Sequence, residues 1–212
     1  YTRRLTEVFE KHGTTGCWYA HASVGTLHVR PVLNLKKDLG AKALRAVAEE
    51  AFAMVREYKG SHSGEHGDGI ARSEFHADMF GQEMVELFQH VKDILDPRGV
   101  FNPNKIVNPP RHDDRNLFRF DPTYEERVRV HSPTKTGFDW SHWGSFSQAV
   151  EMCNNNGACR KTEGGVMCPS YRVTRDEKDV VRGRANSLRL ALSGRFGDNA
   201  LASEAMADTM KL

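Results

Sequence analysis

The sequence predicts an α+β fold, in which helices pack against a small antiparallel sheet. Three observations lead to this prediction: a helix, strand, strand, helix order in the first half, a glycine turn between the two strands, and helical patterns towards the C-terminal end. The chain has 212 residues, enough for one large domain or two small ones.

The first segment predicts a helix followed by a hairpin. In residues 2–12 the apolar side chains recur at helical spacing, and Gly13 ends the pattern. Residues 17–35 are rich in aromatic and β-branched side chains on both sides of Gly25, which favours two strands joined by a tight turn.

The next segments predict two longer helices separated by a loop. Residues 39–58 carry an apolar stripe with a period of 3.6 residues. Residues 60–69 contain four glycines in ten positions, which predicts a loop with unusual backbone angles. A further helix is predicted over residues 77–95, with its apolar residues packed in the core, followed by a proline-rich exit over residues 102–110.

We expect three segments along the chain. Residues 1–110 form a sheet-and-helix domain, residues 111–140 a connector, and residues 141–212 a truncated helical domain. The connector is charged, is interrupted by prolines and has no sustained apolar period. Helices of the third segment are expected at 148–152, 183–193 and 199–210.

The composition excludes several classes of partner. Thirty basic residues against 28 acidic ones give a net charge of +2, too small to favour nucleic acid or an anionic membrane. The apolar runs are far shorter than the roughly 20 residues that span a bilayer. No targeting signal is visible at Tyr1, and the clustered cysteines suit a reducing compartment, so we expect an excised fragment of a cytoplasmic protein, with a peripheral position at the inner membrane face as the alternative.

Two histidines flank the predicted turn. A symmetric loop of two or four residues places His21 directly opposite His28, with both imidazoles on one sheet face and β-carbons about 4.5–5.5 Å apart. Imidazoles at this distance suit one metal ion, and Glu65 in the glycine-rich loop is the candidate third ligand. The alternative is that both histidines are polar residues of a half-exposed hairpin.

The glycine-rich loop favours acid–base chemistry over phosphate binding. Residues 63–69 (SGEHGDG) lack the lysine of a P-loop and place two carboxylates where phosphate would lie. His66, beside Glu65, is suited to be a general base because an unperturbed imidazole titrates near neutral pH. The alternative is a tight structural turn.

Three ordered motifs resemble the C-terminal domain of FAD-linked oxidases of the vanillyl-alcohol oxidase type, in the branch that oxidises D-2-hydroxy acids such as D-lactate and D-2-hydroxyglutarate. The motifs are the histidine pair, residues 63–69 and residues 94–106 (ILDPRGVFNPNKI). The resemblance covers about half of the chain and implies a ferredoxin-like substrate domain. It also implies a divalent metal, usually zinc, bound by His21, His28 and Glu65, with His66 as the catalytic base.

Arg30 is the candidate substrate-binding residue. It follows His28 by two positions and so lies on the same strand face, where its guanidinium could bind a substrate carboxylate through two hydrogen bonds. The alternative is a solvated arginine on the strand. The resemblance implies that FAD is bound mainly by an N-terminal domain absent from this sequence, so no residue here is assigned to FAD.

Cys153, Cys159 and Cys168 indicate an iron–sulfur cluster. With the following proline they are similar to the ferredoxin run C-x2-C-x2-C-x3-C-P, except that Asn156 replaces one cysteine and eight residues separate Cys159 from Cys168. The region resembles the start of a helical, 4Fe–4S ferredoxin-type domain fused behind such oxidases. A zinc knuckle is the alternative, although it usually needs closer cysteine pairs.

The fourth cysteine and six further histidines are expected to have structural roles only. Cys17 is far from the other cysteines in the sequence and is expected to be a buried apolar residue. Six histidines lack partners at useful spacing and are expected at the surface or at helix ends: His12, His76, His90, His112, His131 and His142.

Together these patterns predict a fragment of a flavin-dependent D-2-hydroxy acid dehydrogenase. Electrons would pass from a small 2-hydroxy acid to FAD, then to an iron–sulfur cluster and a downstream acceptor. The fragment alone is expected to be inactive. The alternative is a stand-alone metal-binding or electron-transfer module without hydroxy-acid chemistry.

Overall fold

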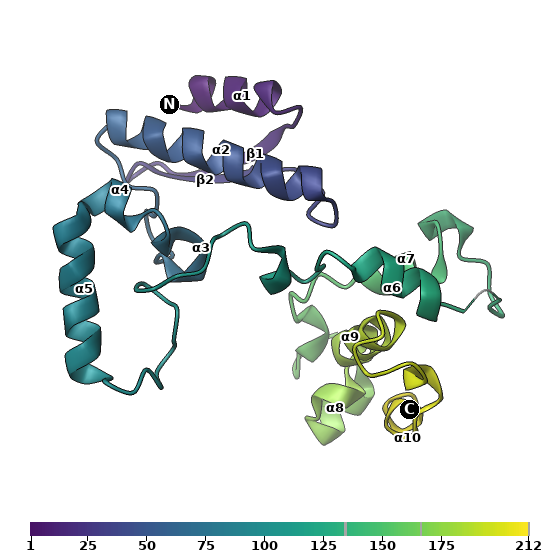
Figure 1. The fold of residues 1–212 in the computed structure, drawn as a ribbon. Coiled ribbons are helices and arrows are strands. Elements are labelled where there is room, and N and C mark those ends of the chain that lie inside the picture. The colour runs from purple at the N-terminus through teal and green to yellow at the C-terminus, as the bar shows by residue number, and fades with distance from the viewer. Residues whose placement is uncertain (134, 166, 212) are drawn as a thin grey trace. The chain divides into compact units, whose positions relative to one another are not determined.

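The computed structural model describes residues 1–133, 135–165 and 167–211, which divide into two compact units, Tyr1–Pro122 and Thr123–Leu212 (Figure 1). The first unit combines helices with a two-stranded antiparallel sheet. In the second unit the regular elements of the described residues are all helical. The predicted mixture of helices with a small antiparallel sheet is therefore confirmed.

The first unit is built on a helix, strand, strand, helix arrangement. Helix α1 (Thr2–Lys11) leads into the hairpin of β1 (Gly16–His21) and β2 (Thr26–Pro31), and helix α2 (Asp38–Glu57) follows. Figure 1 shows the long helix α2 lying along the hairpin, with α1 beside it. This arrangement matches the predicted order of elements, and the ends of α1 and α2 lie within a residue or so of the predicted ends.

The core of this unit forms between α1, α2 and one face of the hairpin. Apolar side chains at helical spacing on α1 meet those of α2, and Trp18 and Val29 pack against them from the paired strands. Gly16 lies so close to Phe9 that a β-carbon there would be 2.3 Å from the Phe9 ring. The buried residues are Leu5, Val8, Phe9, Val47, Ala51 and Met54.

The hairpin register differs from the predicted one by two residues. His21 pairs with Thr26 and Tyr19 pairs with His28, so four residues, 22–25, form the turn. The predicted direct opposition of His21 and His28 is therefore wrong. A shift by two residues keeps every side chain on its face, because side chains alternate with a period of two. His21 and His28 are thus diagonal neighbours on the face opposite to Trp18 and Val29.

The helical segment after the glycine-rich loop is more broken than the sequence predicts. It consists of α3 (Gly69–Ser73), α4 (His76–Phe80) and α5 (Gln82–Leu95), and Gly81, with φ of +91°, interrupts the predicted single helix. No residue of α5 is buried. The assignment of its apolar residues to the core is wrong, because α5 packs chiefly against the short α4 and its apolar stripe stays exposed.

Asp96 fastens the C-terminal end of α5 to the segment that follows. Its carboxylate accepts hydrogen bonds from Lys92 Nζ at 2.6 Å and from the backbone N–H groups of Val100 and Phe101 at 2.9 Å each. The Lys92 contact and the two backbone donors lower the pKa of Asp96 to about 2. The stabilisation from Asp96 is therefore present above its unfolded pKa near 3.8 and is lost as the pH falls to about 2.

Hydrogen exchange should detect this contribution. We expect the protection factors of the Val100 and Phe101 amides to fall as the pH is lowered from about 4 to about 2, since protonation removes their acceptor. Asp96→Asn should lower both protection factors already at neutral pH and flatten this dependence, whereas Asp93→Asn, an exposed neighbour on α5, should leave both unchanged. Unchanged protection in Asp96→Asn would contradict this assignment.

The second unit packs around its longest helix. This helix is α9 (Val181–Leu192), and three others contact it: α6 (Tyr124–His131), α7 (Phe146–Glu151) and α10 (Glu204–Thr209). Helix α8 (Pro169–Thr174) contacts the 3-10 turn Glu177–Asp179. Helices α6 and α8 fall in segments where the sequence patterns indicated none. In the part of the chain that the structure describes, 3-10 turns span Arg115–Leu117, Ser141–Trp143, Ala158–Arg160, Glu177–Asp179 and Ala200–Ala202.

Helix α6 is tied to the rest of its unit by polar contacts. The Tyr124 hydroxyl donates to Glu151 Oε1 at 2.9 Å, and Arg127 Nε donates to the Ser193 carbonyl at 2.7 Å.

The described part of the chain contains no helix long and apolar enough to cross a membrane.

Candidate metal centre

The outer face of the hairpin presents two imidazoles side by side. His21 ends β1 and His28 lies within β2, and the alternation along the strands points both away from the core. Their ring centroids are 5.2 Å apart with nearly perpendicular ring planes. His28 is the more enclosed, with 23% of its side chain exposed against 54% for His21.

Glu65 from the glycine-rich loop faces both imidazoles. Its Oε1 atom lies 3.4 Å from His21 Nε2 and in direct contact with His28 Nε2. The ligand atoms of these three residues all lie within 4.8 Å of one another. Two imidazoles and one carboxylate are a donor set that binds zinc with a coordination position left open for water or substrate. The residues present therefore fit a divalent metal ion.

The loop reaches the sheet because of its glycines. A β-carbon on Gly64 would lie 2.9 Å from Thr26 Cγ2, so a side chain at this position would push the loop away from β2. Gly67 has a φ of +71°, a backbone conformation that other residues rarely adopt. The unusual backbone predicted for this loop is present, and it carries Glu65 onto the histidine face.

His66 is next to the three candidate ligands. Its Nε2 atom lies 2.9 Å from Glu65 Oε1, and its ring centroid is 4.9 Å from that of His28. Its side chain is 73% exposed, so the imidazole is accessible to a small molecule. His66 therefore lies beside Glu65 and His28 with its imidazole open to solvent.

The imidazoles favour the charged form of Glu65. Partial burial opposes ionisation of this carboxyl group, but the nearby His21 and the hydrogen bond with His66 outweigh that effect, and the pKa of Glu65 lies below its usual value. A carboxylate that is ionised at neutral pH is the form that binds a cation.

Arg30 lies on the same sheet face as His28. It pairs with Cys17 across the hairpin, and its guanidinium carbon is 5.4 Å from the centre of the Tyr19 ring. Arg30 is exposed. The stacking on Tyr19 holds a positive charge beside the histidine pair without engaging a carboxylate of the described residues in an ion pair.

The assignment of Cys17 to the core is wrong. Cys17 is exposed, because it alternates onto the outer face of β1. His76, expected at the surface or at a helix end, is the first residue of α4, but it is only 1% exposed and has Asp68 Oδ2 3.0 Å from its Nε2 atom. No sequence pattern singles out His62, which is buried on the other side of Asp68.

The three candidate iron–sulfur ligands lie in the second unit. Cys168 is buried with Tyr171 and Val180, and Cys159 packs against this group. The backbone N–H of Val181 donates to Cys168 Sγ at 3.4 Å. Among the described residues the three cysteine sulfurs do not form a group narrow enough for a single metal ion.

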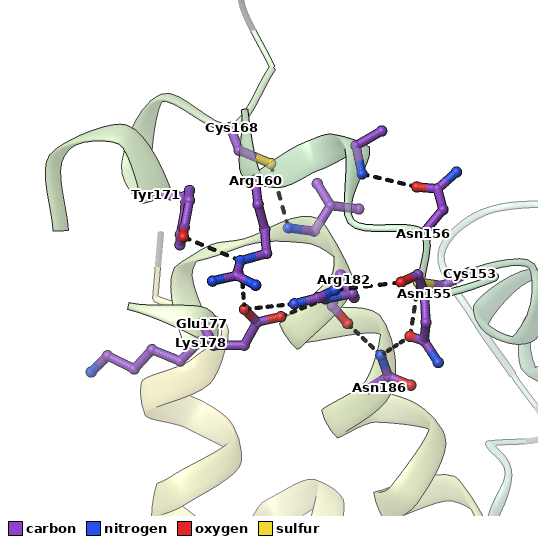
Figure 2. Close-up of polar contacts among 12 residues, drawn as sticks. Cys153, Asn155, Asn156, Arg160, Cys168, Tyr171, Glu177, Lys178, Arg182 and Asn186 are labelled. Atoms are coloured by element: carbon purple, nitrogen blue, oxygen red, sulfur yellow. Dashed lines mark hydrogen bonds and ion pairs between the residues drawn. The ribbon is translucent and has the colours of Figure 1, made fainter. Parts of the chain in front are cut away.

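A network of polar side chains connects the cysteine segments (Figure 2). Arg182 donates to both carboxylate oxygens of Glu177, at 2.7 and 3.0 Å, and Arg160 joins Glu177 to the Tyr171 hydroxyl. Asn186 donates to Asn155 Oδ1 at 2.6 Å, which fixes the loop after Cys153. The network holds the loop between the first two cysteines on α9.

The fold and the site define a mixed helix-and-sheet domain with a candidate metal centre on its outer sheet face. Residues 1–106 match the family described as FAD linked oxidases, C-terminal domain, and the chain belongs to this family.

Curated relatives extend the similarity beyond that domain. A D-2-hydroxyglutarate dehydrogenase of Pseudomonas putida is 31% identical over 206 residues, covering 96% of this chain and 20% of the relative. A D-2-hydroxyglutarate dehydrogenase of Escherichia coli is 27% identical over 190 residues, covering 89% of this chain and 18% of the relative. A D-lactate dehydrogenase of Archaeoglobus fulgidus is 29% identical over 107 residues, covering 50% and 23%. The chain thus spans about a fifth of these relatives. No solved structure matches it significantly.

Proposed function

We propose that this chain is the metal- and substrate-binding portion of a flavin-dependent D-2-hydroxy acid dehydrogenase, of the D-2-hydroxyglutarate or D-lactate type. The observation that supports this most is the convergence of His21, His28 and Glu65, with His66 beside them. The family match and the names of the relatives support the same class of reaction. D-2-hydroxyglutarate is the favoured substrate, because the relative matched over 96% of the chain is named for it.

Each residue has a chemical role in this proposal. His21, His28 and Glu65 would hold a divalent metal, with zinc the expected ion. When bound, the metal would lower the pKa of the substrate hydroxyl, and FAD, held by another part of the protein, would supply the hydride acceptor. His66 accepts the hydroxyl proton on its imidazole, and its exposure lets that proton pass on to water.

Arg30 would bind a substrate carboxylate. A guanidinium matches a carboxylate with two parallel hydrogen bonds, and Arg30 is two positions from His28 on the same face. Arg30→Gln should raise KM by about 10–100-fold, the cost of losing hydrogen bonds to a charged group. Arg30→Lys should recover only part of the loss, and Arg56→Gln, on the exposed side of α2, should change nothing. Initial rates across substrate concentration check this, and an unchanged KM would remove Arg30 from the substrate site.

We also propose that Cys153, Cys159 and Cys168 are ligands of an iron–sulfur cluster that receives electrons from FAD and passes them to a downstream acceptor. The similarity to the Pseudomonas putida relative continues through this segment, and Cys159 and Cys168 pack in the same cluster of side chains. A further ligand is needed to complete the set.

The test is turnover by the complete protein that contains this chain. With FAD bound, we expect reduction of an artificial electron acceptor with D-2-hydroxyglutarate or D-lactate, and not with the L-enantiomers. Glycolate, which has no stereocentre, is included to measure the tolerance of the site. Absence of turnover with all of these acids, in a protein shown to bind flavin, would support the alternative of a metal-binding or electron-transfer module.

A further inference from the structure

A second group of metal-ligating side chains lies in the first unit, where residues 60–69 of the glycine-rich loop meet the start of α4. We call His62, Asp68 and His76 the buried triad. His76 Nε2 is 3.0 Å from Asp68 Oδ2, and His62 Nε2 is 3.6 Å from Asp68 Oδ1. One ligand atom from each residue lies within 4.8 Å of the other two. The buried triad shares no residue with the candidate metal centre on the sheet face.

The two histidines of the triad are buried and, in the described part of the chain, their ring nitrogens make no hydrogen bond, whereas the Asp68 side chain is 20% exposed. His62 and His76 are 6% and 1% exposed. Within the described residues, neither ring nitrogen of either histidine makes a hydrogen bond, and Asp68 Oδ1 makes none. The short His76–Asp68 approach therefore lacks hydrogen-bond geometry. Buried polar atoms normally make hydrogen bonds, so four imidazole nitrogens without one, two of them facing Asp68, point to a ligand that would pair with some of them.

The surroundings of the triad are apolar and aromatic. The ring centroids of Phe52 and Phe80 lie 5.1 and 6.1 Å from that of His62, and those of Phe80 and Phe88 lie 5.4 and 5.9 Å from that of His76. An apolar shell excludes water and strengthens binding of a cation to charged and polar ligands.

The Arg72 side chain holds the backbone of His62 in place. Arg72 Nη1 donates a hydrogen bond to the carbonyl of His62, and the Arg72 guanidinium carbon lies 5.9 Å from the centre of the Phe52 ring. Burial lowers the pKa of His62, which favours the neutral imidazole. A neutral imidazole is the form that binds a metal.

From this geometry we infer that His62, Asp68 and His76 form a second, buried site for one divalent first-row transition ion. Two imidazoles and one carboxylate are ligands that zinc and ferrous iron accept, whereas calcium and magnesium prefer oxygen ligands alone. The ion would connect the glycine-rich loop, through Asp68, to the start of α4, through His76. Its expected role is to stabilise the loop that carries Glu65 and His66.

Zinc binding by the complete protein tests this inference when the sheet-face site has been removed. His21→Ala/His28→Ala, stripped of metal and titrated with zinc alone, should retain a zinc equivalent that is lost when Asp68→Asn is added. Asp78→Asn, an exposed carboxylate on α4, is the matched control and should keep this equivalent. Equal zinc content with and without Asp68→Asn would overturn the inference.

A second measurement does not depend on any variant of the triad. The X-ray absorption spectrum of zinc bound to His21→Ala/His28→Ala should show nitrogen and oxygen ligands at about 2.0–2.2 Å and imidazole scattering. Sulfur ligands at about 2.3 Å would place the zinc on cysteines instead and overturn the proposal, as would absence of bound zinc. Because the sheet-face site is removed in this protein, failure here leaves the dehydrogenase proposal standing.

Discussion

Replacing His66 with glutamine should lower kcat of the complete protein with D-2-hydroxyglutarate by about 10²–10⁴-fold, the usual contribution of a general base. Glutamine keeps a polar side chain of similar reach but cannot accept the hydroxyl proton. Because His66 is not one of the three candidate ligands, the His66→Gln protein should keep its metal at His21, His28 and Glu65. Stopped-flow measurement of flavin reduction by D-2-hydroxyglutarate isolates the step in which the proton and the hydride leave the substrate.

The matched control is His90→Gln, which makes the same change on the exposed side of α5. It should leave flavin reduction unchanged. A His66→Gln protein that reduces its flavin at the normal rate, with normal metal content, would show that another group takes the proton.

Replacing His28 with alanine should remove the metal from the sheet-face site and with it most of the activity. His28 is the more enclosed imidazole and makes the closer approach to Glu65. Changing a residue that only supports a metal ligand typically costs 10–100-fold in metal affinity, so loss of a ligand itself should cost more than about 100-fold. Metal analysis after equilibrium dialysis against limiting zinc, together with kcat/KM, measures both effects.

Glu65→Gln should reproduce the His28→Ala result, because it removes the ligand charge while keeping the side-chain size. His90→Ala supplies the control for a histidine outside the site. Zinc content and kcat/KM that are normal in both His28→Ala and Glu65→Gln would contradict a metal site at this place.

The general arrangement of the first unit follows from the sequence because its signals are local. Periodic apolar residues define α1 and α2, and the glycine turn defines the hairpin. The side-chain alternation of a strand fixes which face a residue occupies, so His21 and His28 share a face whether the pairing register is the predicted one or the observed one. Their common face could therefore be predicted although the register could not.

Features that depend on distant contacts were not accessible in this way. Glu65 could be predicted as a ligand from its residue type and the family resemblance, but its position against the sheet depends on Gly64 fitting over Thr26, which no local pattern encodes. The buried triad is similar: His62 and His76 are far apart in the sequence, and their burial comes from aromatic residues of three different helices. A partial signal is present nonetheless, since Asp68 is the second of the two carboxylates in residues 63–69.

Predictions about burial failed where packing partners were assumed. The apolar stripe of α5 resembles that of any core helix, yet this stripe is exposed because α5 contacts chiefly α4. Cys17 was assigned to the core from its residue type, but the alternation of β1 places it outside. For α5 the apolar pattern is local but the packing partner is not, and for Cys17 the strand alternation decides the face rather than the residue type.

The most direct test of the proposed metal centre is the position of bound zinc in crystals of the complete protein. Anomalous diffraction at the zinc edge should show a peak with His21 Nε2, His28 Nε2 and a Glu65 oxygen at about 2.0–2.2 Å, and with the His66 imidazole outside that shell. Crystals grown with saturating zinc that show no anomalous peak between these three side chains would contradict the proposed metal centre and the dehydrogenase mechanism built on it.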